Sequence, residues 1–115
     1  TISEIDGMLK GMFPIPASMD LGDQGITDKD CEVIGRLLKQ NNTLEILDLS
    51  NNNITDDSGI QSIIDGLKTN NTLKTLYLYN NQLSDNMKSQ LKAIQQYKRD
   101  GSNGYQQVKG MNIYT

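Results

Sequence analysis

Residues 41–49 read NNTLEILDL, and residues 70–78 read NNTLKTLYL. Six of the nine positions are identical. The likeness continues to Asn52 and Asn81, which stand at the same position relative to the start of each copy. Both copies fit the pattern L-x-x-L-x-L-x-x-N-x-L, and a long fixed period of this kind predicts a stack of equivalent structural units.

A weaker copy precedes these two, in residues 16–26. Met19 and Leu21 correspond to the second and third leucines of the next copy, which fixes the alignment. However, Pro16 stands at the first leucine position and Gln24 at the asparagine position. We therefore expect a strand here as well, followed by a looser turn.

The apolar positions between these strand-like stretches follow a different period. Cys31, Ile34 and Leu38 are spaced by three and four residues, and the same apolar spacing recurs one repeat later, in residues 60–67. This spacing places the three side chains on one face of a helix. Residues 2–10 carry the same spacing one repeat earlier, which predicts the helix of a preceding repeat. Each repeat is thus expected to contain one strand and one helix.

The end of the sequence carries a further strand-like stretch. Val108, Met111 and Ile113 have the spacing of the first three leucines of the third repeat. This alignment predicts a last strand in which Tyr114 occupies the same column as Tyr79. The alternative is a short apolar stretch that matches by chance, and the same alternative applies to the N-terminal helix.

The pattern and its period resemble leucine-rich repeats of the ribonuclease-inhibitor-like class, with repeats of about 28–29 residues as in NOD-like receptor and tropomodulin arrays. The resemblance implies an α/β solenoid with a short parallel sheet on the concave face and helices on the convex face. We expect a single leucine-rich-repeat domain over residues 1–115. Its predicted parts are an N-terminal helix and cap, three repeats, and a loop with a final strand: 2–13, 16–43, 44–72, 73–97 and 98–115.

The asparagine of the motif has a structural role in this interpretation. The pattern places Asn52 and Asn81 inside the turn that follows each strand, where their amides can bond to backbone groups. We expect these residues to stabilise the turns rather than to bind a ligand.

The residues that alternate with the leucines point away from the core and form the outer face of the sheet. Tyrosine offers a large contact area with a polar tip and little entropy to lose, which is why it is enriched in the centres of interfaces. Aspartates on the same face favour a partner with basic character. The alternative is that these side chains only pack across the strands. The candidate partner-binding residues are Asp20, Ile46, Asp48, Tyr77, Tyr79 and Tyr114.

The composition argues against several classes of function. The absence of histidine removes the commonest general base and zinc ligand, so we expect no enzyme activity, no cofactor and no bound metal. A net charge of −3 does not suit nucleic acid or an anionic membrane surface. No apolar stretch approaches the ~20 residues of a membrane span. The single cysteine, Cys31, cannot form an internal disulfide, which favours a reduced, cytoplasmic setting.

Three hypotheses for the function follow from these observations. The favoured one is a protein–protein interaction module that binds its partner through the concave sheet face. The second is a structural excerpt or assembly segment of a longer repeat array, with an actin-regulatory, tropomodulin-like role as a minor alternative. The third is an enzyme or enzyme activator, for which no group of residues argues.

The predicted last strand also raises the question of how its edge is covered. No helical pattern follows this strand within the sequence, whereas strand and helix cover each other in the other repeats. A bare sheet edge exposes unpaired backbone groups. We therefore expect self-association through this C-terminal edge, or stacking with further repeats.

Overall fold

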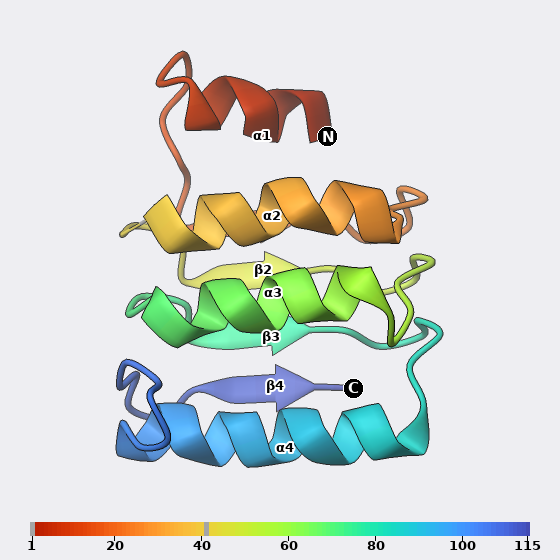
Figure 1. Ribbon diagram of the computed structural model, residues 1–115. Helices are drawn as coiled ribbons and strands as arrows, with labels where there is room; N and C mark the ends of the chain where they lie inside the picture. The colour runs from red at the N-terminus through yellow and green to blue at the C-terminus, as the bar shows by residue number, and fades with distance from the viewer. Residues whose placement is uncertain (1, 41) are drawn as a thin grey trace.

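The computed structural model describes residues 2–40 and 42–115, so Thr1 and Asn41, the first residue of the earlier nine-residue stretch, lie outside the described part. Helices and strands alternate along the chain (Figure 1). In order they are α1 (Ile2–Leu9), β1 (Ser18–Asp20), α2 (Asp28–Gln40), β2 (Ile46–Asp48), α3 (Ser58–Thr69), β3 (Thr75–Tyr77), α4 (Asp85–Asp100) and β4 (Asn112–Tyr114).

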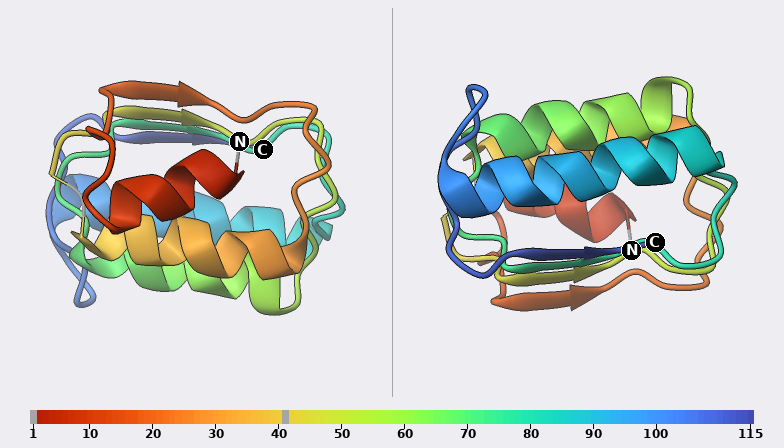
Figure 2. Two further views of the ribbon diagram at one scale, coloured as in Figure 1. Left: turned by 90° about the horizontal axis from the view of Figure 1, so that it is seen from above. Right: turned by 90° about the horizontal axis from the view of Figure 1, so that it is seen from below.

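The four strands form one parallel sheet in the order β1-β2-β3-β4. The helices lie together in a second layer on one side of this sheet, and none of the described helices lies on the other side (Figure 2). The predicted α/β repeat fold with a parallel sheet is confirmed. We call the side of the sheet turned away from the helices the open sheet face.

The core lies between the two layers and repeats from strand to strand. One inward residue of each strand lies beside its equivalent in the next strand, and all four are buried: Met19, Leu47, Leu76 and Ile113. Apolar residues of the helices close the core from the other side, as their spacing of three and four predicts. These buried helix residues include Cys31, Ile34, Leu38, Ile60, Ile63, Leu67, Met87, Leu91 and Ile94.

The turn after each of the first three strands uses the same backbone conformation. Asp23, Asn51 and Asn80 all have a positive φ, at 57°, 57° and 56°. Asparagine and aspartate tolerate this left-handed region better than other residues with a side chain. The Asn80 side chain also donates to the Asn51 side chain over 2.8 Å. Even the weak first repeat therefore makes the same turn as the two regular ones.

Asn52 joins two neighbouring turns through its buried amide. Its Oδ1 accepts from the backbone N–H groups of Gln24 and Ile26 at 3.1 and 2.8 Å. Its Nδ2 donates to the carbonyl oxygens of Leu21 and Leu49 at 3.0 and 2.9 Å. The side chain thus pairs backbone groups that would otherwise be buried without a partner.

Asn81 makes the equivalent contacts one repeat later. Its Oδ1 accepts from the N–H of Ile54 at 3.1 Å, and its Nδ2 donates to the carbonyl oxygens of Leu49 and Leu78 at 2.9 and 3.1 Å. Asn81 is only half-buried, whereas Asn52 is 6% exposed. Both motif asparagines therefore bond to backbone groups of two neighbouring turns, and Asn52 is the more deeply buried of the two.

Glycines let α2 and α3 pack backbone against backbone. A Cβ on Gly35 would lie 2.5 Å from the carbonyl oxygen of Ser62, and one on Gly66 would lie 2.8 Å from that of Gly35. The repeat period places Ile64 where α2 has Gly35. Correspondingly, α3 and α4 are more widely spaced than α2 and α3 (Figure 1).

The register of β4 differs from the sequence prediction by two residues. Ile113 lies beside Leu76, and not beside Leu78. The prediction that Tyr114 shares a column with Tyr79 is therefore wrong, because Tyr114 lies beside Tyr77. The spacing of Val108, Met111 and Ile113 matched the motif, but a turn at residue 110 separates Val108 from the strand. Gly110 has a φ of 70° there.

Side chains of α4 cover part of the outer edge of β4. Gln95 Oε1 accepts from the N–H of Ile113 at 2.7 Å, and Arg99 Nε donates to the carbonyl oxygen of Met111 at 2.7 Å. The expectation of a bare C-terminal edge is therefore wrong at these two groups. Self-association of the chain stays a prediction.

Lys98 is a buried residue that the sequence pattern did not reveal. Its side chain is 0% exposed, and its Nζ donates to the carbonyl oxygens of Leu67, at 2.8 Å, and Asn70. These acceptors belong to the end of α3, where helix carbonyls lack partners within the helix. Burial lowers the pKa of the Lys98 ammonium to about 8, although both carbonyls accept from it.

The N-terminal helix, predicted over residues 2–10, covers Ile2–Leu9 and lies within the segment 2–13 predicted as helix and cap. It ends at Leu9, and Gly11 follows with a φ of 77°. Phe13 then folds back against α1, where a Cβ on Gly7 would lie 2.5 Å from its ring. Met12 and Phe13 are nevertheless 67% and 50% exposed. The end of the molecule at α1 therefore carries apolar surface.

Candidate functional site

The strands place their outward residues in two rows across the open sheet face. The first row contains Ser18, Ile46, Thr75 and Asn112, and the second contains Asp20, Asp48, Tyr77 and Tyr114. Tyr79 lies two residues beyond Tyr77, past the end of β3. The register thus brings five of the six predicted residues into two adjacent rows, with Tyr79 at their margin.

Three tyrosines form one continuous aromatic surface on this face, which we call the tyrosine cluster (Tyr77, Tyr79 and Tyr114). The rings of Tyr77 and Tyr114 are stacked, with centroids 5.1 Å apart and planes inclined by 14°. The Tyr79 ring lies 6.3 Å from that of Tyr77 and 6.0 Å from that of Tyr114. Such ring pairs are stabilising beyond the area that they bury.

The tyrosine cluster is held in place yet remains accessible. Tyr79 is 47% exposed, Tyr114 is 37% exposed, and Tyr77 is half-buried between them. Ile46, in the neighbouring row on β2, is 40% exposed. These four large side chains therefore leave part of their apolar surface in contact with solvent on the open sheet face.

Asp20 and Asp48 form the acidic part of the second row. Each accepts, through Oδ1, from the backbone N–H two residues later: Gly22 at 2.9 Å and Ser50 at 2.8 Å. These bonds fix both carboxylates at the ends of their strands. Asp48 lies in register with Tyr77, so negative charge borders the aromatic surface directly.

The sequence alone pointed to this face, because alternation with the leucines gives the outward direction. It did not show that Tyr114 stacks on Tyr77, because that contact depends on the register after the final loop. The sequence also missed Lys98. The spacing of Met87, Leu91, Ile94 and Lys98 was the available signal, since it continues the apolar face of α4.

A sequence model of the Leucine Rich Repeat family matches residues 43–67 and 72–93. The two matches begin just before β2 and β3 and end within α3 and α4. These two segments are therefore similar to leucine-rich repeats. None of the curated proteins compared with this chain matches it. Leucine-rich repeats generally mediate protein–protein interaction and are typically not enzymes.

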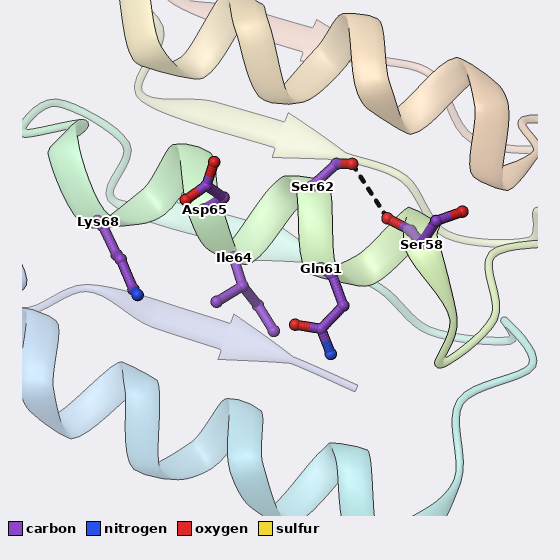
Figure 3. Close-up of a pocket in the computed structure, with 6 residues that line it drawn as sticks. All are labelled: Ser58, Gln61, Ser62, Ile64, Asp65 and Lys68. Carbon is purple, nitrogen blue, oxygen red and sulfur yellow. Dashed lines mark hydrogen bonds between the residues drawn. The ribbon is translucent and has the colours of Figure 1, made fainter.

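The helix layer of these repeats carries a groove beside α3, with a volume of about 460 Å³. Figure 3 shows six residues that line it, all from α3. The Ser62 hydroxyl donates to the carbonyl oxygen of Ser58 at 3.0 Å, and Asp65 pairs with Lys39 at 2.6 Å. The bond from Lys39 lowers the pKa of the Asp65 carboxyl. The groove therefore offers neither a serine paired with a base nor a carboxyl with a raised pKa.

Two properties of the described residues bear on the class of function. Within residues 2–40 and 42–115, histidine, cysteine, aspartate and glutamate side chains do not gather in groups of three or more that could hold a metal ion. In the same part of the chain, every helix is too short or too polar to cross a membrane.

Proposed function

We propose that this chain is a protein-interaction module that binds its partner through the open sheet face. The observation that carries the proposal is the tyrosine cluster, which is ordered by ring contacts while Tyr79 and Tyr114 are still 47% and 37% exposed. Aromatic side chains that are already ordered before binding lose little further conformational entropy when the partner binds. Their burial therefore contributes to affinity with only a small entropic cost.

The charge beside the cluster indicates the character of the partner. Asp20 and Asp48 lie in the same row as Tyr77 and Tyr114. A lysine or arginine side chain over the Tyr77 ring could gain from the face of the ring and from the neighbouring Asp48 carboxylate at once. The open sheet face is thus suited to a partner that presents at least one basic residue.

The test compares partner binding by the wild type and by a double variant, Tyr77→Ala with Tyr79→Ala. Truncating two interface aromatics typically weakens binding by several kcal/mol, which removes most captured protein in a pull-down from cell lysate. Purified actin is included as one direct candidate, because the repeats resemble those of tropomodulins. Thermal unfolding of both proteins checks that the fold is kept, since truncation of exposed side chains usually costs less than ~1 kcal/mol.

The matched control is Met12→Ala with Phe13→Ala, which removes two large exposed side chains far along the chain from the cluster. This variant should capture the same proteins as the wild type. If the tyrosine variant captures them equally well, the open sheet face is not the binding surface.

A second candidate function is supported by the apolar surface near α1. Glu4, Met8 and Phe13 line a hollow of about 350 Å³. Met12, which precedes Phe13 in the sequence, is 67% exposed. A neighbouring repeat would cover such a surface, as α2 and α3 cover each other, so the chain could act by stacking within a larger array. Loss of captured protein in the Met12/Phe13 variant alone would favour this function.

A further inference from the structure

A pocket of about 340 Å³ adjoins the tyrosine cluster on the side of α4. Tyr79 and Tyr114 line it from the sheet, and Lys88, Lys92 and Gln95 line it from the helix. These helix positions follow one another at spacings of four and three residues, so they share one face of α4. The pocket thus combines aromatic walls with two positive charges.

The two lysines of this pocket differ from the three lysines of the chain that form ion pairs. Lys10, Lys39 and Lys74 each pair with a carboxylate at 2.9, 2.6 and 3.2 Å. Lys88 and Lys92 have no ion-pair partner within the part of the chain that the structure describes. Two like charges one helix turn apart repel each other, and an anionic group between them removes that repulsion.

The Gln95 side chain uses its oxygen in a hydrogen bond within the chain, but its NH2 group can still donate to an anionic group in the pocket. Its Oε1 accepts from the N–H of Ile113 at 2.7 Å. The same amide still carries N–H groups that can donate to an oxygen in the pocket. The wall on the helix side therefore offers hydrogen-bond donors and positive charge, which is the chemistry that a carboxylate accepts.

The charge changes from negative on the open sheet face to positive on α4, past the β4 edge of the sheet. Asp20 and Asp48 lie on β1 and β2, the tyrosine cluster follows on and beyond β3 and β4, and the lysines lie beyond β4. Neighbouring strands are ~4.8 Å apart, so about three spacings, or ~14 Å, separate Asp48 from the pocket. An extended segment spans this distance in about four residues.

We propose that the pocket between the tyrosine cluster and α4 receives an acidic side chain of the protein partner. The inference rests on the proposed function and deepens it. The bound segment presents a basic residue to Asp20 and Asp48 and, about four residues away, an aspartate or glutamate to Lys88 and Lys92. The opposite charges at the two ends fix the direction in which the segment crosses the sheet.

The test selects binding sequences from a random peptide library displayed on phage, with the purified full chain as the target. Three proteins are used in parallel: the wild type, Lys88→Glu with Lys92→Glu, and Tyr77→Ala with Tyr79→Ala. The charge-matched control is Lys29→Glu with Lys109→Glu, two lysines outside the pocket. Synthetic peptides from the wild-type selection are then titrated against every protein, including Lys88→Gln with Lys92→Gln.

The proposal expects wild-type peptides rich in aspartate or glutamate about four residues from a basic residue. Lys88→Glu with Lys92→Glu should weaken them by about tenfold or more and should select lysine or arginine at the acidic position instead. The glutamine variant should weaken them less, and the control should bind like the wild type.

Peptides that lack acidic residues, or that bind both lysine variants as well as the wild type, would overturn the inference. The proposed function would then still stand if the tyrosine variant loses those peptides. If the wild type enriches no peptide over the tyrosine variant, both proposals fail. Unfolding of the glutamate variant would leave the decision to the glutamine variant, which adds no repulsive charge.

Discussion

The stretch from β1 to α3 and the stretch from α4 to β4 have the same layered arrangement but are held by different contacts. In the first stretch, backbones come close together: Gly35 leaves no room for a Cβ, and one Asn52 amide bonds to two successive turns. In the second, long polar side chains reach across to backbone groups, as Lys98 and Arg99 do.

The difference follows from whether the repeat period is kept. Where it is kept, each strand residue lies beside its equivalent in the next repeat, and a single glycine or asparagine at one position suffices to join two repeats. The final loop lengthens the last repeat, so Ile113 lies 37 residues after its neighbour Leu76, whereas Leu76 lies 29 residues after Leu47. Side chains with several rotatable bonds then supply the hydrogen bonds, at the expense of more side-chain entropy.

The comparison predicts the largest loss of stability for Gly35→Ala in the regular stretch. The new Cβ would lie 2.5 Å from the carbonyl oxygen of Ser62, and backbone cannot move aside as a flexible side chain can. We expect a loss of about 3 kcal/mol in the free energy of unfolding, measured by urea titration.

Gly7→Ala is the matched control for this substitution. Its Cβ would meet only the Phe13 ring, which is 50% exposed and able to rotate away. Alanine is also the better helix former, so this variant should be close to neutral. Equal losses for the two variants would show that α2 and α3 are not packed backbone to backbone.

An intermediate loss is expected when the motif asparagines are replaced. Asn52→Ala leaves the buried backbone groups of Ile26 and Leu21, and the half-buried N–H of Gln24, without their partner and should cost about 2–3 kcal/mol. Asn81 is half-buried, so water can replace some of its bonds and Asn81→Ala should cost about 1 kcal/mol. Both values come from urea unfolding, and a loss for Asn81 as large as that for Asn52 would contradict the stronger role of the inner repeat.

A dependence of stability on pH is also expected, and it arises at Lys98. Its pKa is about 8 in the folded chain against 10.5 without the fold, so the folded state binds this proton more weakly. The cost of burying the charge is fully present below pH 8 and is relieved as the pH rises toward 10.5. Between these values the unfolded chain holds one more proton, so stability rises with pH, by up to about 1.4 kcal/mol per pH unit.

This contribution is isolated by comparison with Lys98→Met, which keeps a long side chain but cannot titrate. The free energy of unfolding of the wild type, minus that of the variant, should increase as the pH is raised above 8. Parallel curves for the wild type and Lys98→Met would show that the ammonium is not desolvated in the fold.

The sequence was sufficient for the features that depend on period and alternation. The positions of the strands, the apolar faces of the helices and the direction of Tyr77 all follow from the spacing of leucines. The contacts that the sequence did not predict depend on which residues become neighbours in three dimensions. The position of Tyr114 required the left-handed turn at Gly110, which simple residue counting cannot show. Lys98 was missed because lysine is rarely buried, although its spacing placed it on the apolar face of α4.

The surroundings of Cys31 give the chain a built-in reporter of its own opening. The thiol is 0% exposed, and burial, followed by the charges of Asp28 and Asp30, raises its pKa to about 12. Only the thiolate reacts readily with alkylating reagents, so labelling at neutral pH must wait until α2 separates from the sheet. Because the chain has one cysteine, the rate of mass increase under such a reagent measures how often this helix detaches.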